Sequence, residues 1–501
     1  MNEPSRYQQA IYDFVGTGEG NGAGIAVAGS GKTTTAVKSM DNIPGHKSVS
    51  FNCFSSIIAK ELGSRITHLS NAEASTYNAL GWRVCRGRWG FINLSDEGIK
   101  GKNTDKTNDT FKSILGGLLL EEDKKTYFKY KYVMKKLVQL CRGSMCLTTR
   151  QAMDMLPELI DHHDITIKGY DEFLKYFERV YELCINNRHT MDFVDQVFMP
   201  IKYGLEFPRV DFKIIDEYQD TNLLQYETLR RSLCPGGRIL VIGDPNQCIY
   251  GFTGSHRGII DQYIQEFHAV KLPLYICYRC SKAAVRDAQQ WVPHIEPFEK
   301  NKEGIVDYIP YHKYMEMVTD DDLIVCRTIA PLLRSVMRFI GMRILAYVDG
   351  KDIKDGLNNL IDRVTDNNNR MDIPRFDAEL REYVRKQKEW LEKMDRENAI
   401  QTLEGQQDGL QAVMQGCNTV MDLKKTLEIV IPEKGHGRRH MSIHKSKGLE
   451  TSKTGSLFSL PNKPRKLKKE WMIEEEKNLN YVRATRTQNN TYYVEEGEYH
   501  V

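Results

Sequence analysis

Residues 213–222 read Lys-Ile-Ile-Asp-Glu-Tyr-Gln-Asp-Thr-Asn, an apolar strand pattern that ends in two adjacent carboxylates. Charged groups are costly at the end of a buried strand unless they meet a cation or activate water. Far upstream, residues 29–33 read Gly-Ser-Gly-Lys-Thr. This loop follows an apolar run and precedes a helical pattern, the arrangement in which backbone N–H groups surround phosphate oxygens. Together the two stretches predict hydrolysis of a nucleoside triphosphate.

Each residue of these two motifs has a side chain that suits a chemical role. Lys32 would neutralise the β and γ phosphates, while Thr33 and Asp216 would hold Mg²⁺. Glu217 suits the base that orients and deprotonates the attacking water. The residues expected to contact the nucleotide at the loop are Ala28, Gly29, Ser30, Gly31, Lys32, Thr33 and Thr34. Because Ala26 stands at the usual first glycine of the pattern, the loop taken alone also fits a purely structural role.

A third strand pattern ends in a polar motif of its own. Residues 238–242 read Arg-Ile-Leu-Val-Ile, and residues 243–247 read Gly-Asp-Pro-Asn-Gln. We expect the amide of Gln247 to lie where it can sense the γ-phosphate. Three strand ends that carry polar motifs in this order are hard to explain by chance.

Composition and charge bound the class of protein. A chain of 501 residues with 41% hydrophobic residues predicts several domains with filled cores. Because 70 basic and 67 acidic residues leave a net charge of +3, any affinity for polyanions must come from a local groove. No stretch approaches the ~20 apolar residues of a membrane span, and the start lacks a signal-peptide pattern. With eleven irregularly spaced cysteines, we expect a cytoplasmic protein without a membrane partner.

Apolar runs followed by glycine or acidic residues recur along the chain and predict strands. They lie at 24–27, 212–215, 238–242, 323–326 and 344–348. Interleaved with helical patterns, they favour an α/β protein with parallel sheets. The first three runs carry the nucleotide motifs and belong in one sheet, and the last two begin a second sheet.

Two helical insertions are expected. Residues 100–189 are rich in Lys, Leu, Tyr and Met at helical spacing. A second insertion follows the polar turn at 366–370, where one helical face carries Phe376, Leu380, Tyr383, Val384, Gln387, Trp390, Leu391 and Met394. We expect a packed helical hairpin there, in preference to a partner-binding helix.

Whole motifs follow one another in a fixed order along the chain. They read Gln8-Gln9-Ala10-Ile11, Ser75-Thr76-Tyr77-Asn78, Asp216-Glu217-Tyr218-Gln219-Asp220-Thr221-Asn222, Gly243-Asp244-Pro245-Asn246-Gln247-Cys248-Ile249-Tyr250-Gly251-Phe252, Tyr278-Arg279, His444-Lys445-Ser446-Lys447-Gly448-Leu449-Glu450 and Tyr481-Val482-Arg483-Ala484-Thr485-Arg486. In order and spacing the chain resembles superfamily 1 helicases of the UvrD and Rep type (SF1A), from about Gln8 to Arg486.

The resemblance implies two RecA-like, parallel-sheet lobes of the P-loop NTPase class with helical insertions and with ATP between the lobes. The boundaries expected are 1–90 with 201–268 for the first lobe, 91–200 for its insertion, 269–365 with 435–501 for the second lobe, and 366–434 for a short accessory insertion. The accessory segment is much shorter than in the large bacterial members, so a compact motor is expected.

The resemblance also implies roles for residues outside the phosphate loop. Gln8 would read the adenine edge, and Tyr278 would stack on the adenine ring, as an amide and a phenol ring can. Arg279 and Arg486 would stabilise charge on the γ-phosphate in the transition state. Glu450 would link the nucleotide state to DNA contacts.

The family's DNA path uses aromatic rings that stack on the bases of a single strand. Tyr250 and Phe252 occupy the matching positions after Gln247. Further candidates for the same path are Phe51, Asn52, Thr76, Tyr77, Asn78 and His444. For each aromatic residue among them, packing in a core is an equally open interpretation.

The resulting hypothesis is an ATP- and Mg²⁺-dependent DNA helicase that moves 3′ to 5′ on single-stranded DNA and unwinds duplex, in replication, recombination or repair. Its expected partners are single-stranded DNA and single-strand/duplex junctions, with single-stranded DNA-binding or recombination proteins as candidates. It would act at a nucleoid, or in a host cytoplasm if phage-encoded, and a monomer is compatible with the sequence. The alternatives are a translocase that displaces bound proteins with little unwinding, and a nucleotide-gated interaction protein.

Overall fold

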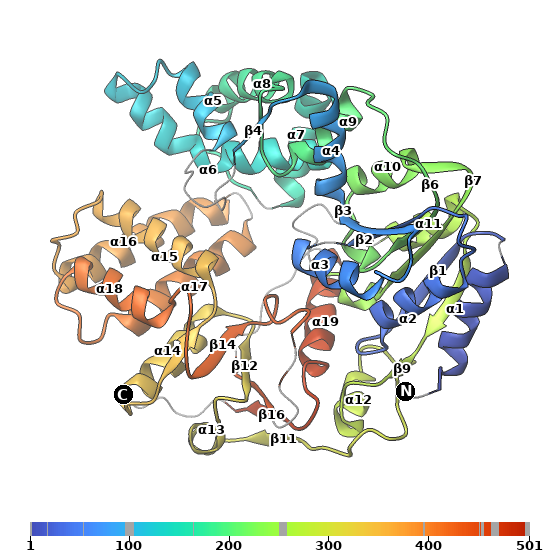
Figure 1. Cartoon of the computed structure of the whole chain (residues 1–501). Coiled ribbons are helices and arrows are strands. Elements are labelled where there is room, and N and C mark those ends of the chain that lie inside the picture. Colours follow the sequence, from blue (N-terminus) through green and yellow to red (C-terminus); the bar gives the residue numbers. More distant parts are fainter. Residues whose placement is uncertain are drawn as a thin grey trace. The chain divides into compact units, whose positions relative to one another are not determined.

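The computed structural model (Figure 1) describes residues 3–17, 19–53, 55–95, 105–163, 165–249, 258–393, 396–449, 451, 455–461 and 470–495. The chain forms two compact units. The first comprises Met1–Ala26 and Gly31–Leu274, and the second comprises Val27–Ser30 and Tyr275–Val501. Within the described segments, no helix combines the length and the apolar character needed to cross a membrane.

The first unit contains a six-stranded sheet with the order β3-β2-β6-β7-β1-β8, in which every neighbouring pair is parallel. Its strands are β1 (Gly22–Ala26), β2 (Val49–Cys53), β3 (Ala72–Thr76), β6 (Val210–Ile215), β7 (Leu233–Gly243) and β8 (Val270–Leu274). The prediction that the first three apolar runs share one parallel sheet is therefore confirmed. Parallel strands end at the same edge of a sheet, so the polar motifs after β1, β6 and β7 meet there.

Helices cover both faces of this sheet because its central strands are apolar on both sides. One face packs on α1 (Arg6–Thr17), α2 (Lys32–Ser39) and α3 (Ser56–Arg65), with the short turn η1 (Met40–Asn42). The other face packs on α10 (Leu223–Arg231) and α11 (Ile259–Glu266). The alternation of β6 distributes Phe212 and Ile214 to the first face and Ile215 to the second. The short turns η2 (Tyr218–Asp220) and η3 (Pro245–Gln247) follow β6 and β7.

A helical region of the first unit has a hydrophobic core separate from the two sheet cores. It consists of α4 (Tyr77–Trp89), α5 (Lys106–Ile114), α6 (Glu121–Gly143), α7 (Thr149–His162), α8 (Tyr170–Asn186) and α9 (Asp195–Lys202), with the strand pair β4 (Asn93–Leu94) and β5 (Thr190–Met191). A buried ion network crosses this core. Asp195 accepts from Lys106 and from Arg142 at 2.5 Å each, and all three side chains are at most 1% exposed.

The second unit contains a second six-stranded parallel sheet, with the order β11-β16-β15-β12-β14-β13. Its strands are β11 (Val306–Ile309), β12 (Leu323–Cys326), β13 (Ala346–Val348), β14 (Arg438–Ser442), β15 (Leu457–Ser459) and β16 (Thr491–Val494). The two last predicted runs, β12 and β13, belong to this sheet, as expected. A short pair, β9 (Ile276–Cys277) and β10 (Glu296–Pro297), and the helices α12 (Lys282–Ala288), α13 (Tyr311–Met317) and α19 (Glu470–Ala484) complete this part of the unit.

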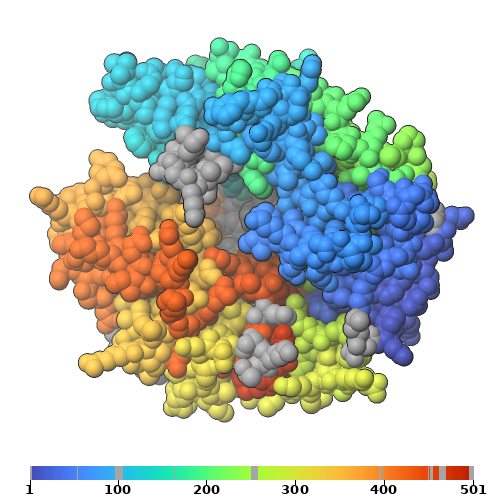
Figure 2. Space-filling view, viewed as in Figure 1, coloured from blue at the N-terminus to red at the C-terminus, as the bar shows by residue number. Residues whose placement is uncertain are grey.

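The helices between β12 and β14 share one core with the sheet of the second unit. Residues of α14 (Ile329–Gly341), α15 (Lys351–Thr365), α16 (Ile373–Lys393), α17 (Glu397–Val413) and α18 (Val420–Val430) belong to one buried cluster with β12 and β13. In the space-filling view their surface, in yellow to orange, forms one continuous block (Figure 2). Of these helices, α16, α17 and α18 lie in the predicted accessory segment 366–434. The predicted helical face is confirmed, because Phe376, Leu380, Val384 and Leu391 are buried; Met394 lies outside the described residues. α18 adds a third helix to the predicted hairpin.

Candidate nucleotide site

In the first unit, Gly31 at the end of the glycine loop leads directly into α2. Gly31 is the residue before the helix and has a φ of 74°, a left-handed conformation that glycine adopts without a steric penalty. Because Lys32 and Thr33 then begin the helix, their free backbone N–H groups form a site suited to anions. The Gln8 amide lies beside this start: its Nε2 donates to Thr35 Oγ1 at 3.2 Å, and its Oε1 accepts from the Ser5 backbone N–H at 3.0 Å.

The start of α2 faces the carboxylates that follow β6. Lys32 Nζ donates to Glu217 Oε2 at 3.2 Å, and Thr33 Oγ1 donates to Asp216 Oδ2. These side chains come from the two motifs that the sequence analysis joined. The first unit therefore brings Lys32, Thr33, Asp216 and Glu217 together.

Negative charge exceeds positive charge at this site. Burial and the Glu217 carboxylate raise the pKa of Asp216 to about 6. Burial also raises the pKa of Asp244, which lies next to Lys32. For Lys32, burial acts to lower the pKa, but Glu217, Asp244 and Asp216 outweigh it and the pKa is raised. One ammonium thus faces three carboxylates. The atoms available to bind a metal ion are all oxygens. These oxygen atoms fit a hard divalent cation such as Mg²⁺, and the roles of Thr33 and Asp216 as its ligands stay a prediction.

Gln219 is a site residue to which the sequence analysis assigned no role. Its Nε2 donates to Glu217 Oε2 at 2.6 Å, and its Oε1 accepts from the Asp244 backbone N–H at 2.9 Å. The amide thereby joins the ends of β6 and β7. Gly243 makes room for it, because a Cβ at that position would lie 2.5 Å from Gln219 Oε1. Glu217 itself has a φ of 51°, a strained conformation for a residue with a side chain, of the kind that recurs at functional sites.

The structure describes the immediate contacts of Gln247. This side chain is 5% exposed, and its Nε2 donates to Asp244 Oδ2 at 2.7 Å. Asp244 Oδ1 also accepts from the Asn246 backbone N–H at 3.1 Å. Gln247 is therefore held at the end of β7 through Asp244, and its role toward a phosphate stays a prediction.

In the second unit, Val27–Ser30 pack with residues from β9 and α19. The Ala28 backbone N–H donates to the Tyr481 hydroxyl at 2.7 Å, and the Tyr278 backbone N–H donates to the Gly29 carbonyl at 2.9 Å. A Cβ at Gly29 would lie 2.7 Å from Arg279 Cβ, so only glycine permits this approach. The Tyr278 ring lies 4.8 Å from that of Phe298, centre to centre.

Two arginines, Arg279 and Arg486, were expected to bind phosphate. In this structure both donate hydrogen bonds to backbone carbonyls of the second unit. Arg279 Nη2 donates to the Thr485 carbonyl at 2.8 Å. Arg486, only 1% exposed, donates to the carbonyls of Val482 at 2.9 Å and Leu449 at 3.2 Å. Their chemistry with a nucleotide stays a prediction.

Comparison with known proteins assigns the family. The UvrD/REP helicase N-terminal domain matches residues 17–268, which is just over half of the chain. This chain belongs to the UvrD/REP helicase family. The matched segment contains both the start of α2 and the carboxylates after β6, so the site described above lies inside it.

This member of the UvrD/REP helicase family aligns with only part of the length of its curated relatives. A probable DNA helicase II homolog of Mycoplasma capricolum is 26% identical over 313 residues, which is 56% of this chain and 41% of the relative. The ATP-dependent DNA helicase Rep of Buchnera aphidicola is 23% identical over 253 residues, 46% of this chain and 34% of the relative. The chain therefore covers well under two thirds of these relatives. A solved Arterivirus nonstructural protein 10 (helicase) with DNA aligns over 98% of this chain and 64% of its own, at a TM-score of 0.35 and 10% identity, too low a likeness to support an argument.

Several residues expected along the DNA path of this family member are buried. Phe51 is fully buried in the core under α1 to α3, and Asn52, also 0% exposed, is buried on the opposite face of β2. Tyr77 is 2% exposed in the core of the helical region. Core packing therefore accounts for both aromatic rings in this structure.

The remaining candidates for the DNA path have described contacts of other kinds. Thr76 Oγ1 caps α4 by accepting from the Ala79 backbone N–H at 3.0 Å, and Asn78 Nδ2 donates to the Phe193 carbonyl at 2.7 Å. His444 Nε2 lies 4.0 Å from a Glu475 carboxylate oxygen in the second unit. Two further candidates for the DNA path, Tyr250 and Phe252, lie outside the described residues, as does Glu450, which was expected to link the nucleotide state to DNA contacts.

Proposed function

We propose that this chain is an ATP-dependent DNA helicase that moves 3′ to 5′ along single-stranded DNA and unwinds duplex. The observation that carries the proposal is the juxtaposition of Lys32 and Thr33 with Asp216 and Glu217 inside the segment that matches the family. A structural glycine loop has no need for a lysine and a hydroxyl that both meet carboxylates. The names of the two relatives, a DNA helicase II homolog and a Rep helicase, support DNA as the partner.

The proposed chemistry assigns one task to each side chain of the site. The N–H groups at the start of α2 and the Lys32 ammonium bind the β and γ phosphates. Glu217 orients the attacking water and accepts its proton, and the Gln219 amide holds the Glu217 carboxylate in position. Mg²⁺, held by Thr33 and Asp216, would neutralise charge on the phosphates. Lys32 now pairs with Glu217, so binding of phosphate would release the carboxylate for its role as base.

The proposal extends to the second unit and to DNA. Arg279 and Arg486 are proposed to stabilise the γ-phosphate during transfer, which requires that they exchange their present carbonyl partners for phosphate oxygens. Gln8 and Tyr278 are proposed to contact adenine. Single-stranded DNA and its junctions with duplex are the proposed nucleic-acid ligands.

The first experiment measures steady-state ATP hydrolysis with and without a single-stranded DNA oligonucleotide, with Glu217→Gln as the catalytic control. We expect DNA to stimulate hydrolysis strongly and the substitution to abolish it while ATP still binds. Hydrolysis that does not respond to DNA would refute the coupling, and unchanged hydrolysis in Glu217→Gln would refute the assignment of the base.

Separate substrates test the direction of movement and distinguish unwinding of duplex from displacement of bound proteins. Duplexes with a single-stranded tail on the 3′ or on the 5′ side separate the two polarities, and we expect unwinding of the 3′-tailed substrate. Displacement of streptavidin from biotinylated single strands without strand separation would favour the protein-displacing translocase instead.

A further inference from the structure

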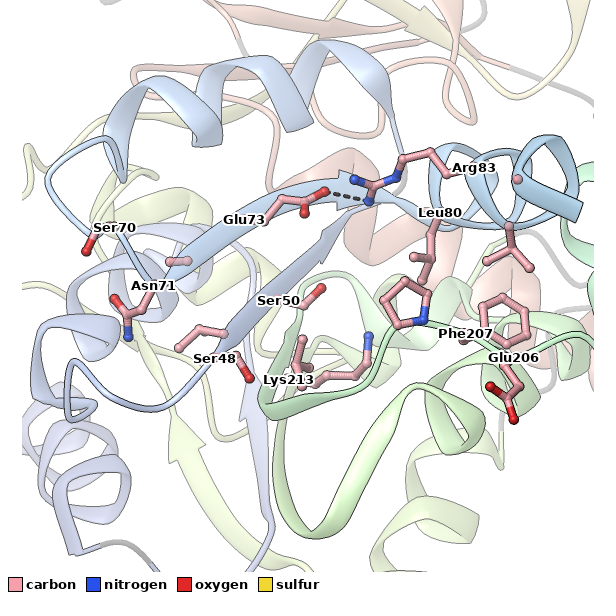
Figure 3. A pocket seen from close by; sticks show the side chains of 16 residues that line it. Ser48, Ser50, Ser70, Asn71, Glu73, Leu80, Arg83, Glu206, Phe207 and Lys213 are labelled. Carbon is pink, nitrogen blue, oxygen red and sulfur yellow. Dashed lines mark ion pairs between the residues drawn. The ribbon is translucent and has the colours of Figure 1, made fainter. Parts of the chain in front are cut away.

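A pocket of about 700 Å³ lies in the first unit between the sheet and α4, apart from the residues of the nucleotide site (Figure 3). Its base is formed by Ser50 and Lys213 on β2 and β6. Its opposite wall is apolar and includes Leu80 and Val84 of α4 together with Phe207. The pocket therefore has a polar end at the sheet and an apolar side along the helix.

The polar end is a single row of side chains across three strands. Ser50 of β2 is the register partner of Lys213 on β6 and of Glu73 on β3. Paired positions of a parallel sheet point to the same face, so these three side chains lie in line on the face covered by α4. Figure 3 shows Glu73 paired with Arg83 beyond Ser50, and their ion pair measures 2.5 Å. The Glu73 carboxylate is thus engaged at the rim, with its side chain 56% exposed.

Lys213 is a buried amine with no carboxylate in contact among the described residues. It is 1% exposed, and its described hydrogen bond runs from Nζ to Asn52 Oδ1 at 3.0 Å. Ser50 Oγ donates to the same Asn52 oxygen at 3.3 Å. The Asn52 Nδ2 group is buried without an acceptor in the described part of the chain. Asn52 is not among the residues that line the pocket, whereas Lys213 is. A lysine ammonium has three donors and the described bond to Asn52 engages one of them, so Lys213 offers further donors at this end of the pocket.

An excess of buried donors calls for a ligand that supplies acceptors. Buried polar groups nearly always find partners, and a charged acceptor forms the strongest bonds with an ammonium. A second observation specifies the rest of the ligand, because the wall formed by Leu80, Val84 and Phe207 suits an apolar group of a few carbon atoms. We propose that this pocket binds a small organic carboxylate whose charged end is held by Lys213 and Ser50.

Binding of such an anion is coupled to protonation of Lys213. Burial lowers the pKa of Lys213 to about 7, and the Glu73 carboxylate only partly opposes this. The other charged groups that line the pocket are Arg83, which pairs with Glu73, and the exposed Glu206. A bound carboxylate favours the charged form of Lys213. The affinity for the carboxylate is therefore full below the pKa of Lys213 and falls about tenfold per pH unit above it.

The test is calorimetric titration of the full chain with hexanoate and benzoate at millimolar concentrations, with inorganic phosphate and benzyl alcohol as comparison probes. We expect the two carboxylates to bind at about pH 6, to bind about a hundredfold more weakly at about pH 9, and to take up a proton in mildly alkaline buffers. Phosphate lacks the apolar group and benzyl alcohol lacks the charge, so both should bind far more weakly.

Two variants separate the site from the surface. Lys213→Met keeps the length of the side chain and removes the donors, and Val84→Trp fills the pocket while leaving Lys213 in place. Both should lose carboxylate binding, whereas Lys60→Met, on the exposed side of α3, should not. Circular dichroism and thermal unfolding check that each variant folds. The proposal is wrong if the wild type binds neither carboxylate, or if Lys213→Met and Val84→Trp, both folded, bind them as the wild type does.

Discussion

Gly243→Ala tests whether Gln219 positions the proposed catalytic base. The added Cβ would lie 2.5 Å from Gln219 Oε1, against about 3.4 Å for an ordinary contact, so the amide must retreat by about 0.9 Å. It cannot turn away freely, since Gln219 is 2% exposed and both ends of its amide are bonded. A retreat of this size takes the 2.9 Å bond between Gln219 Oε1 and the Asp244 backbone beyond hydrogen-bonding range and shifts Glu217.

The expected cost has a structural and a catalytic part. Overpacking of this kind costs about 1–3 kcal/mol of unfolding free energy. Misplacing a catalytic group by about 1 Å costs about a hundredfold in rate, so kcat for ATP should fall by that factor while KM changes little. The assays are urea unfolding and DNA-stimulated ATP hydrolysis.

Two further variants make this result interpretable. Gly143→Ala, where a Cβ meets nothing within 4 Å, should keep full activity and gain a few tenths of a kcal/mol or more. Gln219→Ala removes the amide without crowding the site and should reproduce the loss in kcat. A folded Gly243→Ala protein that hydrolyses ATP at the wild-type rate would refute the role of Gln219.

Two other predictions concern stability. Asp195→Asn leaves Lys106 buried without its carboxylate partner, while Arg142 keeps its pair with Asp192, and should cost about 3–5 kcal/mol in urea unfolding. Glu182→Gln breaks an exposed pair and should cost less than about 1 kcal/mol, so equal losses would contradict this reasoning. Burial lowers the pKa of His440 to about 4, so the stability that neutral His440 contributes is present above about pH 6.5 and is lost as the pH falls toward 4. His440→Gln should flatten the dependence of the unfolding free energy on pH in this range. An unchanged slope would show that other groups control it.

The predictions that the structure supports best are those in which a motif lies at a strand end. The carboxylates after β6 and the loop after β1 are far apart in the sequence, yet both follow strands of one parallel sheet. Because such strands end at a common edge, the strand assignment places both motifs at that edge, and the strand order, with only β7 between β6 and β1, brings Lys32 into contact with Glu217. No register had to be known for this, and an error of one or two residues in the bounds of β1 did not matter.

The face that a strand residue occupies was harder to predict. Phe51 and Asn52 are adjacent on β2, so the alternation of a strand places them on opposite faces. A solvated face would leave one of them available to a ligand. Here helices cover both faces, and both side chains are 0% exposed. The pattern of a single strand does not contain this information, because the faces are covered by helices from other parts of the chain, α1 to α3 on one side and α4, α10 and α11 on the other.

The register between distant strands accounts for what the sequence analysis missed. Lys213 in the middle of an apolar run is the one signal that was available, since a buried strand seldom contains a lysine without a partner. Its meaning depends on the residue opposite, and Ser50 becomes that residue only when β2 and β6 pair. Gln219 is a similar case, because its amide gains a function from the Asp244 backbone and the missing Cβ of Gly243, both at the end of β7. The partners of polar groups that meet residues on neighbouring strands therefore cannot be predicted until strand pairing fixes the register. Groups that meet at a common sheet edge can be predicted without it.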